Sequence, residues 1–190
     1  TFHAGKNADA SLPKGVIVKS LHRAAIEDAE LVERYYGKIA PLNEPATALN
    51  TLLAQDGIFI YVPKGVVVEK PIQIVNILNS PSPLMANRRM LIVIDDDAQA
   101  RILVCDHTQT KGIGYLDSQV VEIFAGHRAV FDYYDLEDSS TDTNRVSSFY
   151  IRQEADSNLM VDGITLMNGF TRNNYIVDLA GEHTELHLMG

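Results

Sequence analysis

The order of hydrophobic and polar positions divides the chain into a helical first part and a longer second part built of short apolar runs. Residues 16–36 are expected to form a strand and then a helix, because VIVKSL is rich in β-branched residues and HRAAIEDAELVERYY in helix formers. Residues 38–57 carry two prolines and then another short run of helix formers, which predicts a connection with a brief helix. We therefore expect an N-terminal helical region over residues 1–48.

From Ile58 onward the helical period gives way to the pattern of strands. Runs of β-branched and aromatic residues are broken by Gly, Asp, Asn or Ser, and the breaks recur at a step of about 25 to 30 residues. Each unit has the order strand, tight turn and strand, which favours a β-solenoid whose coils bury one another's apolar faces. A sandwich or jelly roll also joins many short strands, so the pattern alone leaves these folds open. In each case residues 49–190 form a mainly β domain.

Composition narrows the range of partners and compartments. The 16 Lys and Arg residues against 25 Asp and Glu residues give a formal charge of -9, which disfavours nucleic acid and anionic membranes as partners. Cys105 is the only cysteine, so internal disulfides and paired-cysteine metal motifs are excluded, and a cytoplasmic location is expected. No stretch reaches the roughly 18 apolar residues of a membrane helix.

The segment GEHTELH, residues 181–187, places His183, Glu185 and His187 at alternate positions. In a strand these side chains share one face, and two imidazoles with a carboxylate are suitable ligands for zinc or iron. Alternate side chains on a flat strand stand about 6 to 7 Å apart, whereas metal donors converge at about 2 Å from the ion. We interpret the three residues as a solvent-facing polar row and expect no metal site.

A second candidate is the run VCDHT, in which Cys105 and His107 fall on one face of a strand. A thiolate beside an imidazole can pass sulfur or ligate iron. A single cysteine in a β-rich run is more often a small packed side chain, however. We interpret Cys105 as such a packed group.

The acidic run FDYYDLED carries Asp132, Asp135, Glu137 and Asp138. Two kinds of site use such clusters, the acid pair of a glycoside hydrolase and the calcium cluster of a polysaccharide lyase. The run continues into EDSSTDTN, residues 137–144, which we predict to be an exposed loop with solvated acids. The motifs GxxxxGK[ST], GxSxG and HExxH do not occur, so the chemistry is sparse and we expect no enzymatic activity.

One stretch, LNTLLAQDGIFIYVPKGVVVEKPIQIVN at residues 49–76, closely resembles the SufB/SufD family of the SUF iron-sulfur cluster assembly system. The segments GVIVKSLHRAAIEDAELVERYYGK, RMLIVIDDDAQARILVCDHT and NNYIVDLAGEHTELHLMG resemble the same family, so the likeness covers essentially the whole chain. Val66 follows Gly65 where the SufB branch usually carries a cysteine. The valine at this position favours the SufD branch of the family.

The resemblance implies a right-handed parallel β-helix that follows a short N-terminal α-helical region. It also implies a non-catalytic scaffold without a bound cofactor of its own, on which an iron-sulfur cluster is carried transiently. The implied partners are a SufB-like paralogue and a SufC-like ATPase, and the family has a link to reduced flavin. Its members continue into further coils and a C-terminal helical domain, so we expect a truncated sequence here. The family's cluster-assembly histidine motif matches none of His107, His127, His183 or His187.

Two other functions stay open on the residues alone. One is a carbohydrate-active β-helix enzyme of the polysaccharide lyase type, which uses an acidic groove and calcium, and the other is a purely structural solenoid. The last predicted coil carries Leu186, Leu188 and Met189 with no later strand to cover them. We therefore expect this chain to self-associate as a homodimer through that coil.

Overall fold

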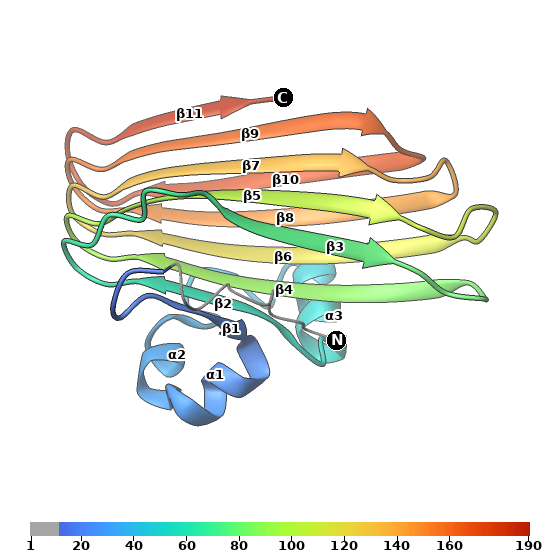
Figure 1. The fold of residues 1–190 in the computed structure, drawn as a ribbon, viewed down its shortest axis with the longest axis horizontal. Helices are drawn as coiled ribbons and strands as arrows, with labels where there is room; N and C mark the ends of the chain where they lie inside the picture. The colour runs from blue at the N-terminus through green and yellow to red at the C-terminus, as the bar shows by residue number, and fades with distance from the viewer. Residues whose placement is uncertain (1–11) are drawn as a thin grey trace.

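The computed structural model describes residues 12–190, which fold mainly into β-strands (Figure 1). Residues 1–11, part of the expected helical region, lie outside the described residues. The short helices are α1 (Leu21–Glu27), α2 (Ala29–Tyr35) and α3 (Pro45–Leu53). The strands are β1 (Ile17–Ser20), β2 (Gly57–Val62), β3 (Ile72–Leu78), β4 (Leu84–Ile94), β5 (Gln99–Thr108), β6 (Tyr115–Ala125), β7 (Val130–Asp138), β8 (Thr143–Gln153), β9 (Asn158–Met167), β10 (Phe170–Leu179) and β11 (Glu185–Met189).

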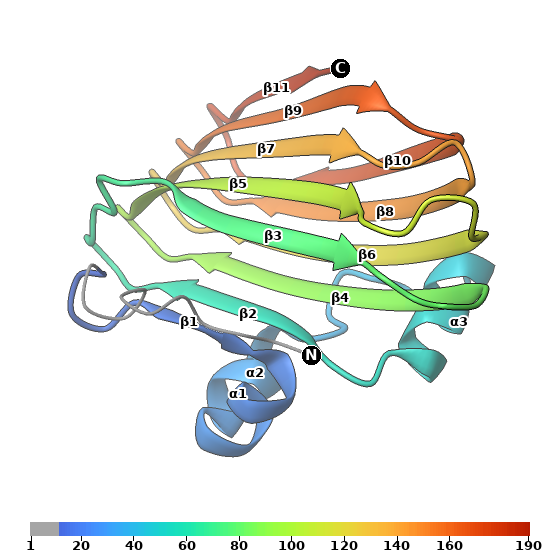
Figure 2. The same cartoon turned by 45° about the vertical axis from the view of Figure 1, so that its right-hand side comes forward.

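These strands form a β-solenoid of about five turns. Sheet A has the order β1-β2-β4-β6-β8-β10, and sheet B has the order β11-β9-β7-β5-β3. Neighbouring strands are parallel, apart from β1, which pairs with β2 in the antiparallel sense. From β2 onward the chain alternates between the two sheets, so each turn adds one strand to each, as Figure 2 shows from the side. The predicted solenoid is confirmed, and the sandwich and jelly-roll alternatives are wrong.

One corner of the solenoid repeats the same backbone conformation in each turn. The corner residues have φ values from 56° to 70° at steps of 27 to 32 positions, and they are Gly65, Asp97, Arg128, Asp156 and His183. Positive φ is costly for residues other than glycine, so these corners need support from their neighbours. Backbone hydrogen bonds between consecutive turns supply it, for example from the N–H of Asp97 to the carbonyl of His127 at 2.8 Å.

The space between the two sheets has an apolar half and a polar half. Interior positions near the positive-φ corner hold aliphatic and aromatic side chains, among them Ile92, Ile123 and Phe131. Interior positions at the other end of the same strands hold charged groups, such as Asp106 and Arg145. The candidate functional site described below lies in the polar half.

The expected helix between residues 22 and 37 is in fact two helices. Asp28 (φ -127°, ψ 37°) ends α1 and precedes α2, and its carboxylate accepts a hydrogen bond from Lys19 Nζ at 2.7 Å. Both helices pack on the outer face of sheet A, where Leu21 and Val32 meet Leu91. In the described part of the chain, no helix is long and apolar enough to cross a membrane.

Candidate functional site

Cys105 lies on the outer face of sheet B but is buried, with 5% of its surface exposed. Its register partners are Val75 on β3 and Leu136 on β7, both apolar. Gln73 Nε2 lies 3.8 Å from Cys105 Sγ and is the polar neighbour of the thiol. The thiol is therefore a packed group with little access to a reactant.

His107 faces an acid and not the thiol. Its Nδ1 lies 3.5 Å from Asp138 Oδ2, and both side chains are 43% exposed. Between residues 12 and 190, no three His, Cys, Asp or Glu side chains are arranged to hold a metal ion. His127 lies in a corner turn, where its backbone N–H donates to Asp96 Oδ1 at 2.9 Å.

The sequence predicted that His183, Glu185 and His187 lie in one strand and share one of its faces. This prediction is wrong for His183. This residue occupies the positive-φ corner before β11, with its Nδ1 3.6 Å from Asp156 Oδ1. Glu185 and His187 do lie in β11, and Glu185 Oε2 accepts a hydrogen bond from Asn158 Nδ2 at 2.8 Å. The corner conformation turns His183 out of the strand, so the three side chains do not line one face.

The acidic run alternates between the two faces of β7. Asp132 and Asp138 point outward, whereas Asp135 and Glu137 point inward and are 2% and 1% exposed. The exposed loop predicted over residues 137–144 is wrong for half of its length, because four of the eight residues are buried: Glu137, Ser139, Ser140 and Thr143. Thr141, Asp142 and Asn144 are exposed, as predicted. Ser139 Oγ donates to Glu137 Oε1 at 2.9 Å, so hydrogen bonds replace the expected solvation.

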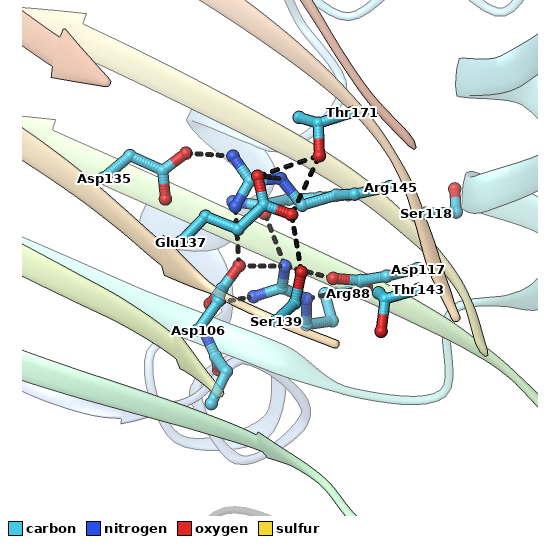
Figure 3. Close-up of polar contacts among 12 residues, drawn as sticks. Arg88, Asp106, Asp117, Ser118, Asp135, Glu137, Ser139, Thr143, Arg145 and Thr171 are labelled. Carbon is cyan, nitrogen blue, oxygen red and sulfur yellow. Dashed lines mark hydrogen bonds and ion pairs between the residues drawn. The ribbon is translucent and has the colours of Figure 1, made fainter. Parts of the chain in front are cut away.

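Two guanidinium groups and four carboxylates meet in the polar half of the interior (Figure 3). This interior charge cluster consists of Arg88, Asp106, Asp117, Asp135, Glu137 and Arg145. Asp106 bridges the two cations, since it accepts from Arg88 Nη2 at 2.7 Å and from Arg145 Nη1 at 2.8 Å. Arg88 also pairs with Asp117, and Arg145 pairs with Asp135.

Neutral side chains from other turns complete the cluster. Asn76 Nδ2 donates to Asp106 at 2.8 Å, and Gln119 Oε1 accepts from Arg88 Nη2 at 2.8 Å. Thr171 Oγ1 lies 2.8 Å from both carboxylate oxygens of Glu137. The partners come from β3 through β10, so the cluster connects successive turns of the solenoid.

The carboxylates of the cluster outnumber its guanidinium groups by two. Burial raises the pKa of Asp135, and the nearby Asp106 adds to this effect although Arg145 opposes it. Burial also acts on Asp106, but Arg88 and Arg145 outweigh it and hold the pKa of Asp106 below its ordinary value. Asp135 Oδ1 has no hydrogen-bond partner among the described residues. Of these two carboxyls, Asp135 therefore takes up a proton more readily.

The acids of the cluster have almost no room for a ligand beside them, whereas Asn76, Arg88 and Gln119 also line a separate cavity of about 1270 Å³. A cavity of about 10 Å³ lies among Arg88, Asp106, Glu137 and Arg145, which is about the space that one water molecule needs. Asp135 and Glu137 are enclosed and paired with Arg145, so they do not form the open acidic groove that a polysaccharide lyase requires. The arrangement links side chains from successive turns of the solenoid.

Fold and cluster together define a parallel β-solenoid domain whose interior ionisable groups are paired with one another. Residues 1–74 match the family described as SufBD protein N-terminal region, and residues 76–190 match the SufBD core domain of the SUF system for FeS cluster assembly. The chain belongs to the SufBD family. The two matches meet near residue 75. The domain boundary expected after residue 48 stays a prediction.

The chain is similar both to a relative named SufB and to a relative named SufD. The chain is 32% identical to the iron-sulfur cluster assembly protein SufB of Bacillus subtilis over 111 residues, which cover 58% of this chain and 24% of that protein. It is 40% identical to SufD of the same organism over 85 residues, 44% of this chain and 19% of that protein. A SufBD family protein of Synechocystis is 23% identical over 188 residues, 94% of this chain and 41% of that protein. The chain thus spans less than half the length of these relatives.

Proposed function

We propose that the chain is a non-catalytic scaffold subunit of SUF iron-sulfur cluster assembly. The observation that carries the proposal is the match of residues 76–190 to the SufBD core domain of that system. The interior charge cluster supports the non-catalytic role, because its acids are paired with Arg88 and Arg145 and are not open to a substrate. Paired in this way, the groups satisfy one another inside the solenoid, which is a structural role.

Within the family we propose the SufD branch, on the strength of Val66 after Gly65 in the segment VVVEKPIQIV. Relatives named SufB and SufD are both similar to the chain, so this assignment rests on the segment alone. The proposed partners are a SufB-type paralogue and a SufC-type ATPase. The iron-sulfur cluster is cargo of that complex, and the chain has no resident cofactor. The proposal also includes a link of the complex to reduced flavin and a cytoplasmic location.

Co-expression of the chain with the SufB-type and SufC-type proteins of the same source tests this function. We expect the three proteins to co-elute from a sizing column as one species by light scattering, and the chain alone to turn over neither ATP, cysteine nor a uronate polymer with calcium. In the matched control an unrelated protein of similar size replaces the SufB-type protein and should not co-elute with the chain. Separate elution of all three, or cleavage of the uronate polymer by the chain alone, contradicts the proposal.

A further inference from the structure

The two sheets of the solenoid differ in length at the end where the chain enters them. Sheet A has six strands and continues past the first turn with β1, whereas sheet B has five strands and ends at β3. Among the described strands only β5 pairs with β3, so the other edge of β3 is free. Natural proteins usually protect such edges with charged residues, proline or a covering segment. The sequence of β3, IQIVNIL, contains neither a charged residue nor a proline.

The pairing of β3 with β5 shows which backbone groups lie on the free edge. The carbonyl of Leu78 accepts a hydrogen bond from the N–H of Gln109 at 2.9 Å, so the backbone groups of Leu78 face β5. Successive residues of a strand direct these groups to opposite sides. Gln73, Val75 and Ile77 therefore direct their N–H and C=O groups away from β5, where they bond no other described residue. The free edge thus offers three donors and three acceptors.

The large cavity named above adjoins this edge. It has a volume of about 1270 Å³, and its lining includes all of β3 and the first part of β4. On the opposite side it is bounded by Val18 of β1 and Ile58 of β2. Figure 2 shows β3 as the strand of sheet B nearest to β2. The cavity therefore lies where a sixth strand of sheet B would continue the solenoid opposite β1.

We infer that the free edge of β3 and this cavity form a docking site for an extended segment of a partner protein, which adds a sixth strand to sheet B. Strand addition to an exposed edge is a general mode of peptide recognition, in which backbone hydrogen bonds supply affinity and alternate side chains supply specificity. The seven residues of β3 span about 23 Å. A segment of similar length therefore occupies the whole edge.

The surroundings of the cavity determine the chemistry of the segment. Ile72, Ile74 and Met90 are apolar and line the cavity from both sheets, so alternate positions of the segment are apolar as well. The interior charge cluster reaches the cavity through Arg88 and has two more acids than cations, and the chain as a whole has a formal charge of -9. An acidic segment is repelled, so the segment is uncharged or basic. This site does not depend on the scaffold function proposed above.

Amide hydrogen exchange measured by NMR tests the site directly. The probe is a capped peptide of alternating valine and threonine with a lysine at each end. The amides of Gln73, Val75 and Ile77 should exchange fast in the free chain and slowly in the presence of the peptide. Those of Ile74 and Asn76 already face β5 and should change little. Protection of the first three amides without peptide, or fast exchange that persists at saturating peptide, overturns the inference.

A backbone variant provides the second measurement. Val75→Pro removes one N–H from the free edge and leaves the bonds to β5 in place, and edge strands tolerate proline. We expect Val75→Pro to weaken binding of the fluorescently labelled peptide about tenfold, the effect of one lost backbone hydrogen bond, as measured by anisotropy. The matched control Val75→Ala keeps the N–H and should bind nearly as well as the wild-type chain. Similar melting temperatures show that both variants fold, and equal affinities of the two variants contradict strand addition.

Discussion

Arg89 on β4 and Glu122 on β6 form a buried ion pair on the outer face of sheet A, with 2.6 Å between Arg89 Nη2 and Glu122 Oε2. Glu122 also accepts hydrogen bonds from the backbone N–H groups of Gly37 and Ile39, at 3.0 and 3.4 Å. Arg89 Nη1 donates to Thr51 Oγ1 of α3 at 2.9 Å. The pair therefore connects the segment after α2, and α3 itself, to the solenoid.

Replacement of the buried acid should destabilise the protein strongly. We expect Glu122→Ala to lower the free energy of unfolding by about 3 to 5 kcal/mol, because Arg89 is left charged and unpaired in the interior. Urea denaturation measures the change. Glu27→Ala is the control, since Glu27 pairs with Lys19 at the surface and its loss should matter little. A similar effect of both substitutions would contradict the role given to Glu122.

The interior charge cluster should make stability depend on pH in two opposite ways. The raised pKa of Asp135 means that the folded state binds this proton more tightly than the unfolded state, so stability falls as pH rises above about 4. The lowered pKa of Asp106 acts in the other direction, and its contribution is lost as pH falls below that value. We expect Asp135→Asn to remove the decline above about pH 4, and to cost less at pH 7 than Asp106→Asn. Urea titrations across the pH range measure both, and a larger cost for Asp135→Asn contradicts the assignment of the proton.

The regular parts of this fold could be predicted from local sequence. The run IQIVNIL after Pro71 indicates a strand and is β3, and the recurrence of such runs indicates the coils. The period-2 alternation within β7 likewise assigns Phe131, Asp135 and Glu137 to one face of the strand. What local sequence could not show is that this face of β7 is the inside along its whole length.

The partners of the buried acids come from other coils, and for this reason the charge cluster does not emerge from any one segment of sequence. Arg145 meets Asp106 across 39 positions of sequence, and Arg88 meets Asp106 across 18. Such contacts depend on the register between stacked strands, which no single segment encodes. One feature of the sequence does indicate a buried cation. Arg145 has the same parity along β8 as Phe149 and Ile151, which are interior residues of that strand. The sequence gives no comparable indication that the expected helix is divided in two at Asp28.

The last coil should support self-association. β10 and β11 are the terminal strands of their sheets, and Leu179, Leu188 and Met189 are 54%, 47% and 48% exposed. Terminal strands present unpaired N–H and C=O groups that favour pairing with another chain. For a polypeptide of these 190 residues, we expect light scattering to show dimers at rising concentration and Leu188→Asp to shift the population toward monomers. A strictly monomeric wild-type chain contradicts this expectation.

Cys105 should be dispensable for cluster assembly. Its thiol is packed beside Val75 and Leu136, so we expect Cys105→Ser to lower the free energy of unfolding by about 1 kcal/mol. The complex with the SufB-type and SufC-type proteins should still form and still carry clusters, as measured by iron content and visible absorption. Loss of clusters from an intact complex would instead identify Cys105 as a sulfur or iron ligand.

The proposed scaffold role makes one quantitative prediction about the yield of clusters. A scaffold acts in proportion to its amount, whereas a catalyst acts repeatedly. The direct measurement is a titration of the chain into a cluster reconstitution that contains fixed amounts of the SufB-type and SufC-type proteins, ATP, iron and a sulfur source. The account predicts that the final cluster yield rises linearly with the chain and levels off at a fixed molar ratio to the SufB-type protein. A full yield at a small fraction of that ratio would show turnover by the chain and contradict the account.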